Sequence, residues 1–244
     1  MNPEGFLNLI KPPGMTSHDV VSLVRRRIGR KTKVGHLGTL DPAAAGVLPL
    51  AVGRATKLIP KLPNLGEDMK GYLGQVQLGL TTTTDDLEGD VLTREDFRGV
   101  TIERLNQVFP HFRGVIQQVP PQVSALKKDG KRAYERVRAG ERVVLEPREI
   151  RVGELTLREF EPAAGRFTIY VRCATGTYIR SLARDMGEML KTGGALGFLL
   201  RTHSGPFHLE QAVSLEEFLT DGVETHLLDC RFPFSTSAGE EAPV

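Results

Sequence analysis

Residues 35–57 read GHLGTLDPAAAGVLPLAVGRATK, a stretch of mostly small and apolar residues that contains one histidine and one acid. The acid, Asp41, stands directly before Pro42, and an Asp-Pro pair commonly starts a turn. Proline also biases the preceding residue toward an extended backbone, which would hold the carboxylate on a rigid loop. Two hypotheses therefore stay open for Asp41: a turn residue, or a nucleophile or base.

Arg180 is the second unusual residue. It stands in GTYIRSLARDMG at 176–187, where apolar residues recur at helical spacing. In the first turn of that predicted helix a positive charge opposes the helix dipole. One explanation is a surface arginine paired with Asp185 or Glu188. The other is a buried arginine directed at a carboxylate elsewhere, for which Asp41 is the candidate.

Three ring side chains can be ordinary structural residues or parts of a nucleic-acid site. Tyr72 and Tyr178 are two of only four tyrosines. Each is either a half-buried aromatic or a ring that stacks on a base or moves a proton. His36, five residues before Asp41, is either a loop histidine or a flat wedge that fills the gap left by an extruded base.

Basic residues are concentrated in two segments of a chain whose net charge is only +2. Residues 25–33 carry six basic side chains and no acid, and residues 127–148 carry eight against four acids. Each cluster alone is explained by a solvated surface. Together they favour a polyanion as partner, since phosphate contacts release counterions.

Several common classes of protein are disfavoured by the sequence. It contains no Walker motif, no HExxH, no Cys-x-x-Cys and no G-x-S-x-G, so we expect neither metal nor cofactor. No apolar run reaches the length of a membrane span. The first residues lack the pattern of a signal peptide, and only two cysteines are present, so we expect a cytoplasmic protein.

The spacing of apolar residues and of caps predicts an α+β fold. Helices are expected from the Thr16-Ser17 cap to Gly29, over 101–109, from Ile179 to a stop at Gly193-Gly194, and over SLEEFLTDG at 214–222. Strands are expected over 72–78, 150–157 and 167–173.

Five stretches occur together in an order that resembles one family, the bacterial tRNA pseudouridine synthase B family. They are KPPGMTS at 11–17, the stretch at 35–57, KGYLGQVQLGLTTTTDDLEG at 70–89, PPQVSALKKDGKRAYERVRAG at 120–140 and VRCATGTYIRSLARDMG at 171–187. The resemblance covers roughly residues 5–232. It implies an isomerase that converts uridine 55 in the T loop of tRNA to pseudouridine after flipping the base, with no cofactor.

The resemblance also implies roles for individual residues. Asp41 would be the catalytic nucleophile and Arg180 its salt-bridge partner. Tyr72 would stack on the target uracil and act as the base at C5. His36 would occupy the place of the flipped nucleotide, and the substrate would be contacted by Tyr178 and Leu199. Lys11 and Pro12 match a motif that packs beneath the catalytic loop.

The implied architecture is the pseudouridine synthase fold, a central mixed, mostly antiparallel sheet flanked by helices. Residues 1–232 would form the catalytic domain, with an inserted thumb at about 120–148 that clasps the T stem-loop; we call residues 120–148 the thumb segment. Its RNA contacts would include Lys127, Lys128, Lys131 and Arg132. Residues 233–244 would form a short disordered tail, without room for a full PUA domain.

Two residues depart from the family pattern, and the first of them, Val123, concerns an RNA contact of the thumb. Val123 stands where the family often has an aromatic, and Leu200 replaces the first arginine of an L-R-R-T signature at 199–202. We expect a monomer without an obligate protein partner. The alternatives are a non-catalytic RNA-binding protein on the same scaffold, and a relative of the RNA-guided enzymes that modify ribosomal RNA.

Overall fold

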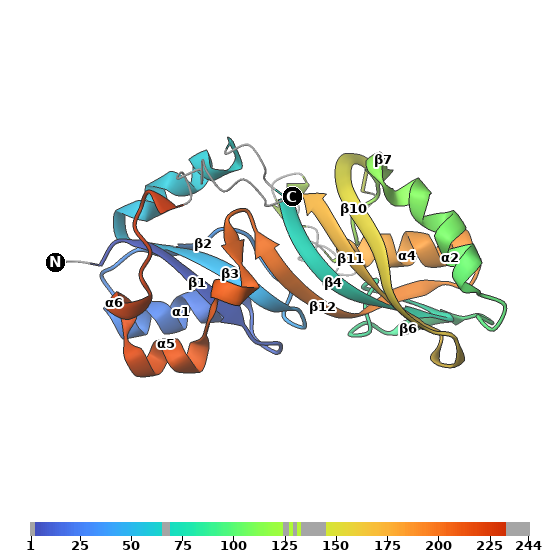
Figure 1. The fold of residues 1–244 in the computed structure, drawn as a ribbon, viewed down its shortest axis with the longest axis horizontal. Coiled ribbons are helices and arrows are strands. Elements are labelled where there is room, and N and C mark those ends of the chain that lie inside the picture. The colour runs from blue at the N-terminus through green and yellow to red at the C-terminus, as the bar shows by residue number, and fades with distance from the viewer. Residues whose placement is uncertain (1–2, 65–68, 124–126, 129–130, 133–144, 233–244) are drawn as a thin grey trace, which may run out of the picture. The chain divides into compact units, whose positions relative to one another are not determined.

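The computed structural model describes residues 3–64, 69–123, 127–128, 131–132 and 145–232 (Figure 1). The expected tail at 233–244 and much of the thumb segment lie outside the described residues. The chain divides into two compact units, one of Met1–Lys70 with Leu200–Val244 and one of Gly71–Leu199. In the described part of the chain, no helix is long and apolar enough to cross a membrane.

The first unit is built on two long antiparallel strands, β1 (Gly5–Lys11) and β3 (Ala45–Val52), paired from Gly5 with Val52 to Lys11 with Gly46. The short strand β2 (Val34–His36) pairs with β3. Leu200 and Arg201 of β12 (Gly194–Ser204) run parallel to the start of β3. The remaining elements of this unit are α1 (Ser17–Ile28), η1 (Gly53–Asn64), β13 (Phe207–His208), η4 (Leu209–Gln211), β14 (Val213–Ser214), α5 (Leu215–Asp221) and α6 (Val223–His226).

Both faces of β1 and β3 are buried in this unit. Leu7 and Leu9 pack on one face against α1 and Phe218 of α5, which lie on the same side of the sheet (Figure 1). Phe6 packs on the other face with Phe207, because successive strand residues point to opposite sides. Strands covered on both faces are continuously apolar, which explains the run AGVLPLAV of β3.

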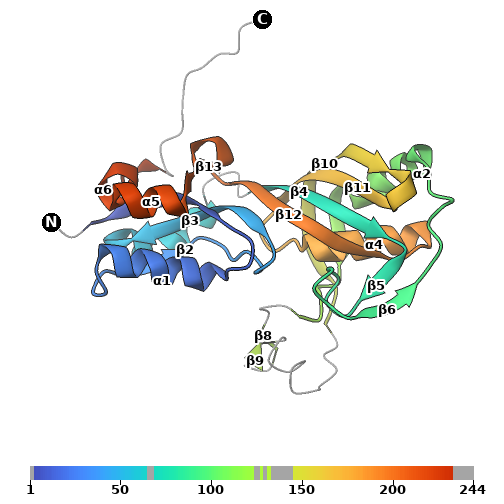
Figure 2. The ribbon, with the colours of Figure 1, turned by 90° about the horizontal axis from the view of Figure 1, so that it is seen from below.

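The second unit contains strands in the order β12, β4, β11, β10, β7. Pairing is antiparallel between β10 and β11 and between β10 and β7. Their bounds are β4 (Met69–Leu78), β7 (Gly114–Gln118), β10 (Arg148–Glu161) and β11 (Arg166–Ala174). Two further strand pairs are β5 (Leu80–Thr82) with β6 (Val91–Arg94), and β8 (Lys127–Lys128) with β9 (Lys131–Arg132) (Figure 2).

The helical elements of the second unit are α2 (Ile102–Val108), η2 (Phe109–Phe112), η3 (Pro162–Ala164) and α4 (Ile179–Leu190). Arg104 of α2 donates a 2.7 Å hydrogen bond from Nη2 to the carbonyl of Leu190, which joins α2 to the end of α4. The expectation of an α+β fold with a mixed, mostly antiparallel sheet flanked by helices is confirmed.

The local predictions were correct for α1, whose Thr16 cap forms a capping box with Asp19. The predicted stop of α4 at Gly193-Gly194 was wrong. The helix ends at Leu190, and Lys191 adopts the left-handed conformation (φ 62°) that closes it. The glycines serve close packing instead, because a Cβ on Gly194 would lie 2.5 Å from the carbonyl oxygen of Ala183.

Candidate active site

Asp41 lies in the loop between β2 and β3, and two side chains from other elements hold this loop through its backbone. Ser17, at the start of α1, donates from Oγ to the carbonyl of Leu40 (3.1 Å) and accepts from the Leu40 amide (2.9 Å). The carbonyl of Pro42 accepts from Lys11 Nζ at 3.0 Å. The residues on both sides of Asp41 are therefore fixed.

Lys11 is fully buried at the end of β1. Its ammonium also donates to the carbonyls of Pro12 (2.9 Å) and Met15 (2.7 Å), so it joins the KPPGMTS stretch to the Asp41 loop. Burial lowers the pKa of Lys11 to about 8, although the nearby Asp41 carboxylate acts in the opposite direction. Lys11 is still mainly protonated at pH 7.

Arg201 holds the same loop from β12 and is also fully buried. Its Nε donates to the carbonyl of Val47 at 2.7 Å, Nη1 to that of Thr39 at 3.3 Å, and Nη2 to that of Gly38 at 3.1 Å. The planar guanidinium suits three carbonyls in different directions. Arg201 thus links the two sides of the Asp41 loop.

His36 ends β2 in the same unit, opposite Leu50 of β3. Burial lowers its pKa, and the positive charges of Arg201, His18 and Lys70 lower it further. Its Nδ1 is buried without a hydrogen-bond partner among the described residues. The ring is therefore neutral near pH 7, and a neutral imidazole is the form that suits stacking against a base.

In the second unit, Tyr72 lies on β4 and Leu199 on β12, each less than a tenth exposed. Gly74 stands two residues after Tyr72, and a Cβ there would meet Ile179 at 3.3 Å and Leu199 at 3.7 Å. The absence of a side chain at 74 lets the start of α4 and β12 approach β4.

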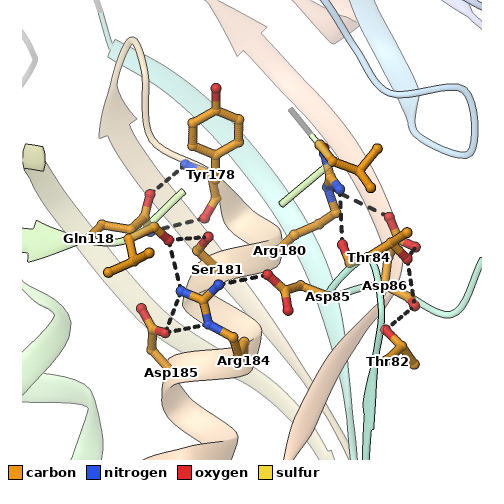
Figure 3. A network of polar contacts seen from close by, with 12 residues as sticks. Thr82, Thr84, Asp85, Asp86, Gln118, Tyr178, Arg180, Ser181, Arg184 and Asp185 are labelled. Carbon is orange, nitrogen blue, oxygen red and sulfur yellow. Dashed lines mark hydrogen bonds and ion pairs between the residues drawn. The ribbon is translucent and has the colours of Figure 1, made fainter. Parts of the chain in front are cut away.

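Tyr178 precedes α4, and its backbone is held by Gln118 at the end of β7 (Figure 3). The Tyr178 amide donates to Gln118 Oε1 at 2.9 Å, and Gln118 Nε2 donates to the Tyr178 carbonyl at 3.1 Å. The tyrosine ring points away from this polar network in Figure 3.

Arg180 is buried, with 6% of its surface exposed. Its Nη1 donates to the carbonyl of Thr84 at 2.9 Å and its Nη2 to that of Val123 at 3.1 Å. Asp86 Oδ2 lies 3.6 Å from Nε. The alternative of a surface arginine paired with Asp185 or Glu188 is wrong, because Arg180 is buried.

The remaining predicted residues lie on the β8–β9 hairpin. Lys127 is paired with Arg132 and Lys128 with Lys131 in its register, so the backbone brings all four positions together.

Asp41 belongs to one unit, and Tyr72 and Arg180 belong to the other. The ion pair between Asp41 and Arg180 stays a prediction, as do the roles assigned to these residues. The described residues contain no cluster of His, Cys, Asp and Glu that could hold a metal.

Two family models together match most of the chain and show the family to which it belongs. Residues 25–179 match the TruB family pseudouridylate synthase N-terminal domain, and residues 180–230 match the tRNA pseudouridylate synthase B C-terminal domain. The chain belongs to the TruB family.

TruB relatives are similar along most of their length. A protein of Carboxydothermus hydrogenoformans named tRNA pseudouridine synthase B is 50% identical over 222 residues, 89% of this chain and 75% of the relative. The protein of that name from Symbiobacterium thermophilum is 48% identical over 215 residues, 88% of this chain and 71% of the relative.

Among solved structures, a Cbf5–Nop10–Gar1 complex contains a chain with a TM-score of 0.70 and 30% identity. The similarity covers 94% of this TruB-family chain and 61% of that chain. A structure of an H/ACA RNP bound to a substrate RNA containing 2′-deoxyuridine has a TM-score of 0.67 and 27% identity, covering 94% and 60%.

The sequence analysis of this TruB-family chain missed the contacts of Arg201 in the first unit and of Asp86 in the second. Arg201 was considered only as part of a signature in which Leu200 departs, and Asp86 only as part of the family motif at 70–89. One signal for Asp86 was the density of hydroxyl and acidic residues after β4, since these form hydrogen-bonded turns. Indeed Thr84 Oγ1 donates to Asp86 Oδ1 at 2.5 Å.

Proposed function

We propose that this chain is a tRNA pseudouridine synthase that isomerises uridine 55 of the T loop. The observation that carries the proposal is family membership across residues 25–230. A relative named tRNA pseudouridine synthase B is 50% identical in sequence to this chain. The rigid loop that carries Asp41, held through Lys11 and Arg201, supports a catalytic role for that acid.

The reaction requires a nucleophile, a base and access to the target nucleotide. The N1–C1′ bond breaks, the uracil rotates, C5 bonds to C1′, and the proton on C5 is removed while N1 becomes protonated. Asp41 is the nucleophile, attacking either C1′ or the uracil ring, and Tyr72 stacks on the uracil and takes the C5 proton. Atoms and electrons balance within the substrate, so the isomerisation requires no redox partner.

Flipping the target base costs stacking energy that the protein must offset. We assign the gap left by the base to His36, whose lowered pKa keeps the ring neutral. Contacts to the flipped nucleotide are assigned to Tyr178 and Leu199. Stacking on Tyr72 supplies part of the compensation, and phosphate contacts supply the rest.

A cavity of about 530 Å³ in the first unit offers one place for such phosphates. Its lining includes Lys31 and Lys33 from the first basic cluster, together with Lys57 and Arg54. Glu4 pairs with Arg54, so three lysines supply the positive charge. The second basic cluster, on the thumb segment, would contact the T stem-loop.

The test is to incubate the purified chain with tRNA transcribed without modifications and to map pseudouridine by position. We expect pseudouridine at position 55 and at no other position. A tRNA with cytidine at 55 is the matched control. Modification at a different position would overturn the site assignment, and tight binding without any modification would favour the non-catalytic RNA-binding alternative.

A further inference from the structure

The backbone that leads into the thumb segment is held by side chains of α4. The carbonyl of Val119, directly before the segment, accepts hydrogen bonds from Ser181 Oγ at 2.9 Å and from Arg184 Nη2 at 2.8 Å. Ser181 and Arg184 are three residues apart and so lie on one face of the helix. Within the segment, the carbonyl of Val123 accepts from Arg180.

Arg184 contacts a second segment with the same guanidinium. Its Nη1 donates to Asp85 Oδ2 at 2.7 Å, and its Nε donates to Asp185 Oδ1 at 2.9 Å (Figure 3). The side chains of Arg184, Asp85 and Asp185 are 25%, 14% and 26% exposed, so solvent screens these contacts only in part. Arg184 therefore bridges Val119, the residue that leads into the thumb segment, and the loop of residues 83–90.

The loop of residues 83–90 also carries the partner of Arg180. The consecutive acids Asp85 and Asp86 face Arg184 and Arg180, which stand one helical turn apart on α4. Asp85 has a φ of 62°, a backbone conformation that non-glycine residues adopt rarely and that surrounding contacts must maintain. The ion pair with Arg184 is one of those contacts.

We propose that Arg184, through Asp85, is a positioning residue for pseudouridine formation. The proposal rests on the proposed function. Arg180 contacts Thr84 and Asp86 on the loop and Val123 in the thumb segment. Arg184 fixes both of these segments to the helix that carries Arg180, so it keeps the guanidinium of Arg180 in one orientation.

A purely structural role would give a different result. Removing one partner of a fully buried ion pair commonly lowers stability, whereas a pair that solvent partly screens, such as Arg184 with Asp85, contributes less. Burial raises the pKa of Asp85, and the charges of Arg184 and Arg180 lower it by a smaller amount. A positioning contact is therefore expected to affect rate more than stability.

The experiment compares Arg184→Lys, Asp85→Asn and the double variant with wild type in the full chain. With an unmodified T-arm RNA, we expect single-turnover rates to fall roughly 10- to 100-fold, as for a misplaced catalytic group, and Kd to change less than about threefold. The double variant should be no slower than the slower single variant, because both changes disrupt the same contact between Nη1 of Arg184 and Oδ2 of Asp85. Arg98→Ala, which breaks an exposed ion pair with Asp96 in the same unit, is the matched control.

Amide hydrogen exchange gives a readout that does not depend on catalysis. Faster exchange confined to residues 83–90 and 118–123 in the Arg184 and Asp85 variants, with an unchanged Tm, is expected. Unchanged exchange there, or an equal loss of rate, binding and Tm, overturns the positioning role. If wild type modifies no RNA, the proposed function fails separately, and the exchange pattern still decides whether Arg184 holds both segments.

Discussion

The loops that carry Asp41 and Asp86 are held in two different ways. Around Asp41, the buried cations Lys11 and Arg201 contact backbone carbonyls. In the other unit, Arg180 and Arg184 contact carboxylates as well as carbonyls. Contacts to the backbone fix a loop whatever side chains it bears, so the Asp41 loop can present a reactive acid. Contacts to carboxylates instead orient the arginines themselves.

The largest effect should come from the acid on the backbone-held loop. Asp41→Asn keeps the size of the side chain and the contacts of its neighbours, so we expect the rate of pseudouridine formation to fall on the order of 10⁴-fold or more. Binding of T-arm RNA, measured by filter retention, should be largely unchanged. Turnover close to that of wild type would end the assignment of Asp41 as nucleophile.

Removing a buried cation should show how much stability the backbone contacts provide. Lys11→Met leaves the carbonyls of Pro12, Met15 and Pro42 without their donor, so we expect the free energy of unfolding to fall by roughly 2–4 kcal/mol. Unfolding of both proteins in urea measures this loss of free energy of unfolding.

The matched control for that variant is Arg54→Met, which breaks an exposed ion pair with Glu4 in the same unit. Its Tm should equal that of wild type, because exposed ion pairs contribute little. Equal stability of Lys11→Met and wild type would mean that the loop does not depend on the lysine.

The thumb segment should contribute binding rather than loop geometry. Replacing Lys127, Lys128, Lys131 and Arg132 together with alanine should weaken RNA binding and reduce the slope of log K against log salt, by roughly one for each phosphate that the variant no longer neutralises. Titrations at several salt concentrations measure this slope. Arg231→Ala, an exposed arginine paired with Asp229, is the control; an unchanged slope in the quadruple variant would remove these residues from the RNA interface.

The smallest effect concerns the pH dependence of the carboxylate-held loop. Burial and the charge of Asp86 raise the pKa of Asp85, while Arg184 and Arg180 lower it by a smaller amount. A carboxyl group whose pKa is raised on folding stabilises the protein below its unfolded pKa, and this contribution is lost as the pH rises through the raised value.

The free energy of unfolding of wild type minus that of Asp85→Asn should therefore fall as the pH rises from about 4 and then become constant. Urea unfolding of both proteins across the acidic range measures the difference. A difference that increases with pH would mean that the two arginines outweigh the burial of Asp85, which would make the ion pair with Arg184 a source of stability.

Local signals in the sequence determined several elements. The Thr16 cap and the apolar spacing determined α1, the Ser214 cap determined α5, and the alternation from Phe167 to Cys173 determined the buried face of β11. In each case a nearby set of residues carries the whole pattern. The ordered motifs likewise identified the family before any geometry was known.

Strands without alternation escaped the sequence analysis. β1 and β3 were not predicted, because strands buried on both faces lack the period of two that marks a half-exposed strand. The family resemblance supplied the fold class that these segments did not reveal by themselves.

Only the tertiary structure decided how the loops are held. Arg201 reaches carbonyls 154 to 163 positions away, and Arg184 reaches Asp85 across 99 positions. Nothing local distinguishes a buried arginine that holds a loop from an exposed one, because the difference lies in which distant carbonyls and carboxylates the fold brings near. The sequence by itself determined which acid is proposed as the nucleophile, and the packing of strands and helices decided what holds its loop in place.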